Sequence, residues 1–254
     1  MKPDVIYREK LVSFWDIPRG ARVLELGCGQ GETTRALLRA VGARGFVHGI
    51  DSAGADYGAP ETLGDARSEL LAGRYGARLQ MDFDTDIFSV KPQDGGYGYA
   101  VLSHCSWYFE NAEELEKTLL KARELADTLC FAEWDLHLSD PAQLVHYRAV
   151  AAQAIAQSYT PSDMLNIRTL FTREDILDAL AASGWRVTRT ASLETGTPDG
   201  AWERNNALAV LPSMIEVMNA PEALKRYLRS ELRAIEASDA KDAIALPSIA
   251  ISAE

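Results

Sequence analysis

The feature that most constrains the fold is an alternation of short apolar runs with longer amphipathic stretches between Arg22 and Trp134. Short apolar runs bounded by turn residues favour strands buried on both faces, and the longer stretches favour helices. This order is typical of a parallel sheet with crossover connections. We therefore expect a doubly wound α/β sheet with strands at 22–26, 45–50, 77–81, 99–103 and 128–134, and with helices at 32–42, 59–73 and 111–126.

The chain on either side of this region is expected to be mainly helical. Residues 4–15 carry apolar side chains at helical intervals and predict an amphipathic helix over a sheet edge or a cleft. The C-terminal part predicts helices at 140–158, from Thr172 onward, at 202–218 and at 222–236. Pro212 leaves one alternative open, because it could also end a strand at 206–211.

Two further apolar segments complete the predicted sheet. The stretch 185–194 alternates apolar and polar residues, as a strand with one solvated face does, and 243–252 is expected to pair antiparallel with it. No linker or internal repeat divides the chain, so we expect one domain, 1–254, with an N-terminal helix within 1–20 over the cleft. The segments 140–171 and 198–238 are predicted to be helical lid insertions.

Composition excludes several classes of function. The net charge is −11, from 37 acidic and 26 basic residues, whereas nucleic-acid binding depends on a basic face. Three cysteines, Cys28, Cys105 and Cys130, show no disulfide framework or metal-ligand spacing, which suits a reducing compartment. The sequence shows neither a signal peptide nor a membrane-spanning run, so a cytoplasmic protein without membrane association is expected.

The first predicted strand ends in a glycine-rich turn, V-L-E-L-G-C-G-Q-G, with Gly27, Gly29 and Gly31. Glycines here permit a tight turn and let backbone N–H groups and the next helix N-terminus approach a ligand. A nicotinamide dinucleotide turn requires G-x-G-x-x-G, but Glu32 and Thr34 occupy the positions where its third glycine would fall. The spacing therefore disfavours an NAD-dependent dehydrogenase.

The turn resembles the first motif of class I S-adenosylmethionine-dependent methyltransferases, in which an acidic residue, here Glu25, precedes the glycines. The resemblance implies a Rossmann-like fold, with residues 21–135 as the cofactor-binding half and S-adenosylmethionine as the cofactor. Asp51, which ends the second strand, corresponds to the family's ribose-binding acid. Many relatives carry an acid after the aromatic residue of the fourth strand, but here Gly98 follows Tyr97.

By this resemblance, the residues expected to bind the cofactor are Glu25, Gly27, Cys28, Gly29, Gly31, Asp51, Asp82, Phe83 and Ser103. Asp82 and Phe83 would meet the adenine. Two alternatives stay open: Asp51 could cap a turn, and Asp82 could belong to a solvated acidic loop.

Side chains that follow the fourth strand are candidates for the acceptor side. His104 could act as a general base near neutral pH, or it could pack and hold a loop. Trp107 and Tyr108 could wall an acceptor or fill the core. His137 could join His104 around a metal, but no short ligand spacing supports this, and we expect no metal. His48 and His146 are interpreted as structural.

Together these features predict an enzyme that transfers a methyl group from S-adenosylmethionine to an oxygen or nitrogen of a small molecule. Catalysis would come mainly from positioning, because in-line transfer from a sulfonium needs no covalent nucleophile. The alternative is a non-catalytic module of the same fold that binds S-adenosylmethionine or a partner. The sequence leaves the acceptor and the oligomeric state open.

Overall fold

The computed structural model describes residues 2–91, 96–161, 165 and 167–254. Across these residues, seven strands form one sheet in the order β3-β2-β1-β4-β5-β7-β6. β1 to β5 are parallel neighbours, and β7 pairs antiparallel with both β5 and β6, so the predicted Rossmann-like sheet with a final antiparallel strand is confirmed. The strands are β1 Arg22–Leu26, β2 Phe46–Ile50, β3 Leu79–Asp82, β4 Tyr97–Ser103, β5 Ala126–Trp134, β6 Val187–Leu193 and β7 Ser248–Ala253.

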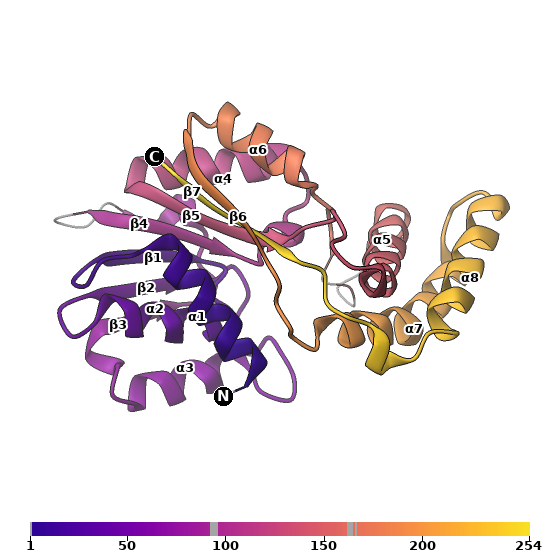
Figure 1. Ribbon diagram of the computed structural model, residues 1–254, viewed down its shortest axis with the longest axis horizontal. Helices are drawn as coiled ribbons and strands as arrows, with labels where there is room; N and C mark the ends of the chain where they lie inside the picture. Colours follow the sequence, from indigo (N-terminus) through magenta and orange to yellow (C-terminus); the bar gives the residue numbers. More distant parts are fainter. Residues whose placement is uncertain (1, 92–95, 162–164, 166) are drawn as a thin grey trace.

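Helices cover both faces of the sheet (Figure 1). One face carries α1 Pro3–Trp15, α2 Glu32–Val41 and α3 Leu63–Ala72, and the other carries α4 Ala112–Leu125 and α6 Arg173–Ala182. Each face encloses its own hydrophobic cluster, because strands buried on both sides present apolar side chains in both directions. The result is a three-layer domain in which the ends of the strands can form a binding site.

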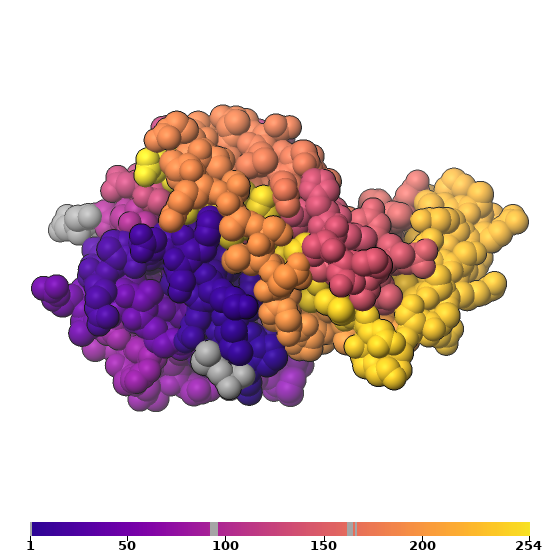
Figure 2. All heavy atoms as spheres, viewed as in Figure 1, coloured from indigo at the N-terminus to yellow at the C-terminus, as the bar shows by residue number. Residues whose placement is uncertain are grey.

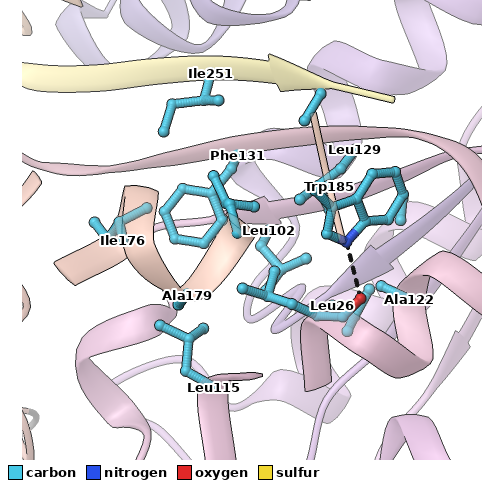
Figure 3. Packing of buried hydrophobic residues seen from close by; sticks show 14 of the residues in the cluster. Leu26, Leu102, Leu115, Ala122, Leu129, Phe131, Ile176, Ala179, Trp185 and Ile251 are labelled. Atoms are coloured by element: carbon cyan, nitrogen blue, oxygen red, sulfur yellow. Dashed lines mark hydrogen bonds between the residues drawn. The ribbon is translucent and has the colours of Figure 1, made fainter. Parts of the chain in front are cut away.

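The cluster beneath α4 and α6 is packed around Phe131 (Figure 3). Phe131 and Leu102 are fully buried between the sheet and these helices. The indole N–H of Trp185 donates to the Leu119 carbonyl oxygen at 2.9 Å, so this ring is buried without an unpaired donor. This packing fixes α4 and α6 on the sheet.

Three further helices form a separate unit, here called the accessory helices: α5 Leu144–Tyr159, α7 Asp199–Val217 and α8 Glu222–Glu236. They project from one end of the sheet and pack on one another around their own hydrophobic cluster (Figures 1 and 2). Pro212 lies inside α7, so the alternative of a strand at 206–211 is wrong. The predicted insertion 140–171 includes residues 162–164 and 166, which lie outside the described residues.

Side-chain caps begin several of the helices. Thr172 and Asp175 form a capping box at the start of α6, and the Asn111 side chain accepts the Glu114 N–H at the start of α4. In the part of the chain that the structure describes, no helix combines the length and apolar character needed to cross a bilayer.

Candidate functional site

The glycines of this turn are required for two reasons, their backbone conformation and the closeness of neighbouring atoms. Gly27, Gly29 and Gly31 all have positive φ, at 67°, 50° and 82°, which only glycine adopts readily. A Cβ on Gly27 would lie 2.5 Å from the Cys105 Cβ, and one on Gly31 would lie 2.6 Å from Leu70. A Cβ on Gly29 would meet nothing within 4 Å. Gly27 and Gly31 therefore admit neighbouring protein atoms, and of the three only Gly29 has open space where a Cβ would stand.

That space is a cavity of about 660 Å³ at the carboxyl ends of β1, β2 and β4. Its volume is typical of a small-molecule site, and its position is where ligands bind in open α/β sheets. Of the predicted cofactor residues, those that line it are Glu25, Gly27, Cys28, Gly29, Asp51 and Ser103, and the candidates His104 and Tyr108 line it as well.

Asp51 is held in place by the backbone of two loops. Its Oδ2 accepts the Gly29 N–H at 2.9 Å, and its Oδ1 accepts the Ala53 N–H at 3.0 Å. Each carboxylate oxygen has a second lone pair, so the group can accept further hydrogen bonds from a ligand in the cavity. The glycine turn and the acid one strand over thus form one rigid arrangement.

Asp82 and Phe83 do not appear among the residues that line this cavity. The Asp82 carboxylate accepts hydrogen bonds from His48 Nε2 at 2.9 Å and from Gln80 Nε2 at 2.6 Å. The Phe83 ring lies beneath the Arg67 guanidinium, 5.0 Å away. The wall beyond β3 is formed instead by residues 85–88.

The two aromatic candidates after β4, Trp107 and Tyr108, lie in different environments. Trp107 is 5% exposed, belongs to the core and donates through Nε1 to the Phe171 carbonyl oxygen. Tyr108 is 44% exposed and lines the cavity. Among the predicted acceptor-wall residues, the structure therefore brings Tyr108 and not Trp107 to the cavity.

Arg8 and Glu25 place a guanidinium and a carboxyl group in the cavity wall. Arg8 projects from α1 and donates through Nη1 to the Ser103 Oγ at 3.1 Å, while its Nε is buried without a partner among the described residues. Glu25 accepts a hydrogen bond of 2.6 Å from Thr34 Oγ1. Burial raises the pKa of Glu25 to about 8, despite the opposing effects of Thr34 and Arg8. Sequence reasoning missed Arg8, because its helix offered only an amphipathic pattern.

His104 is in contact with Tyr7 and Glu133. Its Nε2 lies 2.6 Å from the Tyr7 hydroxyl and its Nδ1 lies 3.3 Å from Glu133 Oε1. Burial holds the pKa of Tyr7 well above its usual value, so Tyr7 keeps its proton and can donate to a neutral imidazole. Burial and the charge of Arg8 lower the pKa of His104. Both ring nitrogens therefore face protein groups.

Glu133 is an ionised carboxylate enclosed by donors. Burial alone would raise its pKa, but contacts from His104 and hydrogen bonds from Ser106 and the Trp134 N–H lower it overall. The Ser106 N–H and Oγ lie 2.9 and 2.7 Å from its Oε2. This network fixes the loop that follows β4 and orients His104, whose φ of 55° is in the left-handed region.

In the described part of the chain, His137 shares no hydrogen-bond or ion-pair partner with His104. It is 58% exposed and faces Asp135 and Glu174, and Asp135 also pairs with Arg173. Within the described residues, no group of three His, Cys, Asp or Glu side chains could hold a metal ion.

Comparison with known proteins adds independent evidence. Residues 5–190 match the family model described as a methyltransferase domain. Methyltransferase phomM′ of Diaporthe leptostromiformis is 30% identical over 213 residues, which cover 68% of this chain and 54% of the relative. The chain therefore spans about half the length of the curated relatives it matches.

Solved structures show the same fold. A cyclopropane-fatty-acyl-phospholipid synthase-like protein from Lactobacillus casei matches with a TM-score of 0.88 and 29% identity, over 99% of this chain and 90% of that protein. The mycolic acid cyclopropane synthase CmaA1, in complex with SAH and CTAB, matches with a TM-score of 0.60 and 14% identity, over 98% and 83% of the two chains. The family match, the order of the sheet and the glycine turn show that this chain belongs to the class I S-adenosylmethionine-dependent methyltransferases.

Proposed function

We propose that the protein transfers a methyl group from S-adenosylmethionine to an oxygen or nitrogen of a small-molecule acceptor. The observation that carries the proposal is the Arg8 guanidinium and the Glu25 carboxyl group in one cavity wall beside the glycine turn, with Asp51 at the next strand end. A methionine moiety carries one ammonium and one carboxylate, and a ribose carries vicinal hydroxyls. The donor set thus fits this cofactor group by group.

Different residues would bind different groups of the cofactor. Glu25 would hold the ammonium group, and the buried, unpartnered Nε of Arg8 would meet the carboxylate. Asp51 would accept from the ribose hydroxyls. Asp82 and Phe83 remain proposed adenine neighbours, together with Ile87 and Phe88, which line the cavity at the same end of the sheet.

S-adenosylmethionine, when bound, supplies an electrophilic methyl group on a positively charged sulfur. The protein would hold this methyl group opposite the acceptor and exclude water. Such positioning can lower the activation barrier by about 7–11 kcal/mol. A general base adds about 3–5 kcal/mol. His104 remains the proposed base. Because the Tyr7 hydroxyl contacts Nε2, the acceptor must replace that hydroxyl before it can transfer a proton to Nε2.

The acceptor and the cellular setting are proposed on general grounds. A cavity of about 660 Å³ suits a small molecule, and a net charge of −11 disfavours nucleic acid. The three cysteines are free thiols, which fits the proposed cytoplasmic location.

Calorimetry with S-adenosylmethionine, S-adenosylhomocysteine and NADH tests the cofactor assignment. We expect both sulfur nucleosides to bind and NADH not to bind. Arg8→Gln should weaken S-adenosylhomocysteine binding about 10- to 100-fold, because hydrogen bonds between charged groups contribute roughly 1.5–3 kcal/mol. Lys10→Gln removes an equal charge from an exposed position of the same helix and should leave affinity unchanged.

Equal effects of the two substitutions would contradict the role of Arg8, and NADH binding in place of the nucleosides would contradict the proposed function. Binding without methyl transfer to any of a metabolite panel would favour the non-catalytic module. Product detection by mass spectrometry separates that outcome from turnover.

A further inference from the structure

Several residues that line the cavity have no part in the proposed cofactor contacts. Among them are Tyr108, which closely follows His104 in the chain, and Arg168, which lies between α5 and α6. Because His104 is the proposed base and lines the same cavity, we expect the acceptor to contact this part of the wall. The chemistry of Tyr108 and Arg168 therefore bears on what the acceptor is.

Backbone hydrogen bonds hold Arg168 against the loop that carries Tyr108. The Arg168 N–H donates to the Trp107 carbonyl oxygen at 2.8 Å, and the Thr169 N–H donates to the same oxygen at 3.2 Å. Thr169 Oγ1 also donates to the Glu110 carbonyl oxygen at 2.8 Å. Trp107 is itself buried in the core. The backbones of Arg168 and Tyr108 are therefore fixed relative to each other, although they lie far apart in the sequence.

Arg168 brings a positive charge that the cofactor does not use. Among the residues that the structure describes, arginine or lysine lines the cavity at two positions, Arg8 and Arg168. The proposed function assigns Arg8 to the cofactor carboxylate, so Arg168 remains to meet a negative group on a second ligand. Its guanidinium has five N–H donors in a planar fork, which matches the two oxygens of a carboxylate.

The ion pair that Arg168 makes with the protein is weak. Its Nη1 lies 3.7 Å from Glu110 Oε1, which is longer than a hydrogen bond, and the two side chains are 43% and 71% exposed. Exposed pairs of this kind contribute little to stability, because water solvates both groups well. A carboxylate on a ligand can therefore replace Glu110 at the guanidinium.

The acidic residues of the cavity wall are engaged elsewhere. Asp86 Oδ1 and Glu114 Oε2 each accept a backbone N–H of their own loop, at 2.9 and 2.7 Å. Glu25 and Asp51 belong to the proposed cofactor contacts, and Glu32 begins α2 directly after the glycine turn. The guanidinium of Arg168 retains donors for an anion, so the acceptor side of the wall favours a negative group.

Tyr108 adds an apolar surface to the same wall. Its large side chain is 44% exposed and lines the cavity, and so does Tyr57, which is 48% exposed. Exposed aromatic rings at a cavity are typical of ligand-binding surfaces, because contact with a ligand removes their apolar area from water. A molecule with a flat apolar body would therefore pack on Tyr108 while its anionic group reached Arg168.

We propose that the acceptor is a small molecule with a carboxylate group, which Arg168 binds, and with an apolar body that packs on the Tyr108 ring. This inference rests on the proposed function, because it takes the cofactor site and the role of His104 as given. A carboxylate is favoured over a phosphate, since one arginine balances one negative charge and a phosphate carries nearly two. An acceptor anchored in this way would present another of its oxygen or nitrogen atoms toward His104.

Two probes of nearly equal shape test the charge, because benzoate is an anion and benzamide is neutral. Their affinities are measured by saturation-transfer NMR with S-adenosylhomocysteine present, so that Arg8 is occupied. We expect benzoate to bind about tenfold more tightly, through charge-assisted hydrogen bonds to a partly exposed guanidinium. Arg168→Gln should remove this preference. Glu110→Gln removes the competing carboxylate and should tighten benzoate binding by up to about fivefold, with benzamide unaffected.

Arg186→Gln is the matched control. Arg186 is also an exposed arginine paired with an exposed glutamate, Glu254, and it lies outside the cavity lining, so this variant should retain the full preference. Tyr108→Ala should weaken both probes alike and leave the preference intact, because the ring contacts the apolar body that the probes share. Circular dichroism confirms that each variant is folded.

Absence of benzoate binding, equal binding of the two probes, or an undiminished preference in folded Arg168→Gln would overturn the proposal. A preference that is lost in Arg8→Gln and kept in Arg168→Gln would place the anion at the cofactor end of the cavity and would overturn it as well. If S-adenosylhomocysteine failed to bind while the preference still depended on Arg168, the proposed function would be overturned and the anion site would stand.

Discussion

The carboxyl group of Glu25 is buried in the cavity wall, and this sets a pH dependence. Its pKa is raised by burial to about 8, well above the model-compound value of 4.5. Between these values the ligand-free folded protein holds a proton on Glu25 that the unfolded chain has lost, so folding becomes less favourable as the pH rises. The stabilising effect of the protonated form is fully present below the unfolded pKa and is lost as the pH passes through the folded pKa.

We therefore predict that Glu25→Gln, which mimics the protonated acid, gains stability relative to the ligand-free wild type between pH 5 and pH 8. Urea unfolding of both proteins at several pH values measures the difference in the free energy of unfolding. Parallel pH curves would show that Glu25 is ionised throughout this range and would contradict the assigned environment.

Among individual residues, the sequence predicted those that belong to a local motif or end a predicted strand. Glu25, Gly29 and Asp51 line the cavity because the turn and the strand ends place them there. Arg8 could not be found in the same way, since it lies on a helix outside the motif and only the tertiary fold brings it to the site. The side chain of Asp82 engages His48, a contact that strand register produces and that no spacing in the sequence reveals.

The element that best shows how packing determines stability is α4, where adjacent leucines have opposite environments. Leu119 is 0% exposed and packs in the sheet core, and Leu120 is 52% exposed. We predict that Leu119→Ala lowers the free energy of unfolding by about 2–5 kcal/mol through lost burial and an incompletely filled cavity. Leu120→Ala should cost less than about 1 kcal/mol, because helix propensity is nearly the same.

Chemical denaturation monitored by far-ultraviolet circular dichroism gives both values, with Leu120→Ala as the matched control. Similar losses for the two variants would mean that α4 does not present this face to the core. A small loss for Leu119→Ala alone would mean that the surrounding side chains collapse into the vacated volume.

Elements were predictable where periodicity and capping agreed and ambiguous where a single residue conflicted with them. Pro212 removes one backbone hydrogen bond from α7 and destabilises the helix by roughly 3 kcal/mol. For this reason the sequence alone also allowed a strand that ends before Pro212. The helix persists because Ala207, Val210, Leu211, Met214 and Ile215 recur at helical spacing and are buried against α5 and α8. That compensation depends on partners that α7 meets only in the folded molecule.

The whole molecule consists of a sheet domain that carries the cavity and an accessory unit with its own core (Figure 2). The order of the sheet was predictable, because helices between apolar strands imply parallel crossovers. How the accessory helices meet the sheet was not, since the contacts of Trp134 with His146 join segments whose orientation no local pattern encodes. How strongly cofactor binding couples the two parts therefore depends on contacts such as these.

Hydrogen–deuterium exchange measures that dependence. None of the residues that line the cavity, among those the structure describes, belongs to α8, which packs on α5 and α7. We predict that S-adenosylhomocysteine slows exchange strongly in peptides covering 22–57 and 97–108, which surround the cavity, and leaves α8 unchanged. Protection of α8 by S-adenosylhomocysteine would contradict this prediction and would mean that the two parts respond to the cofactor as one body.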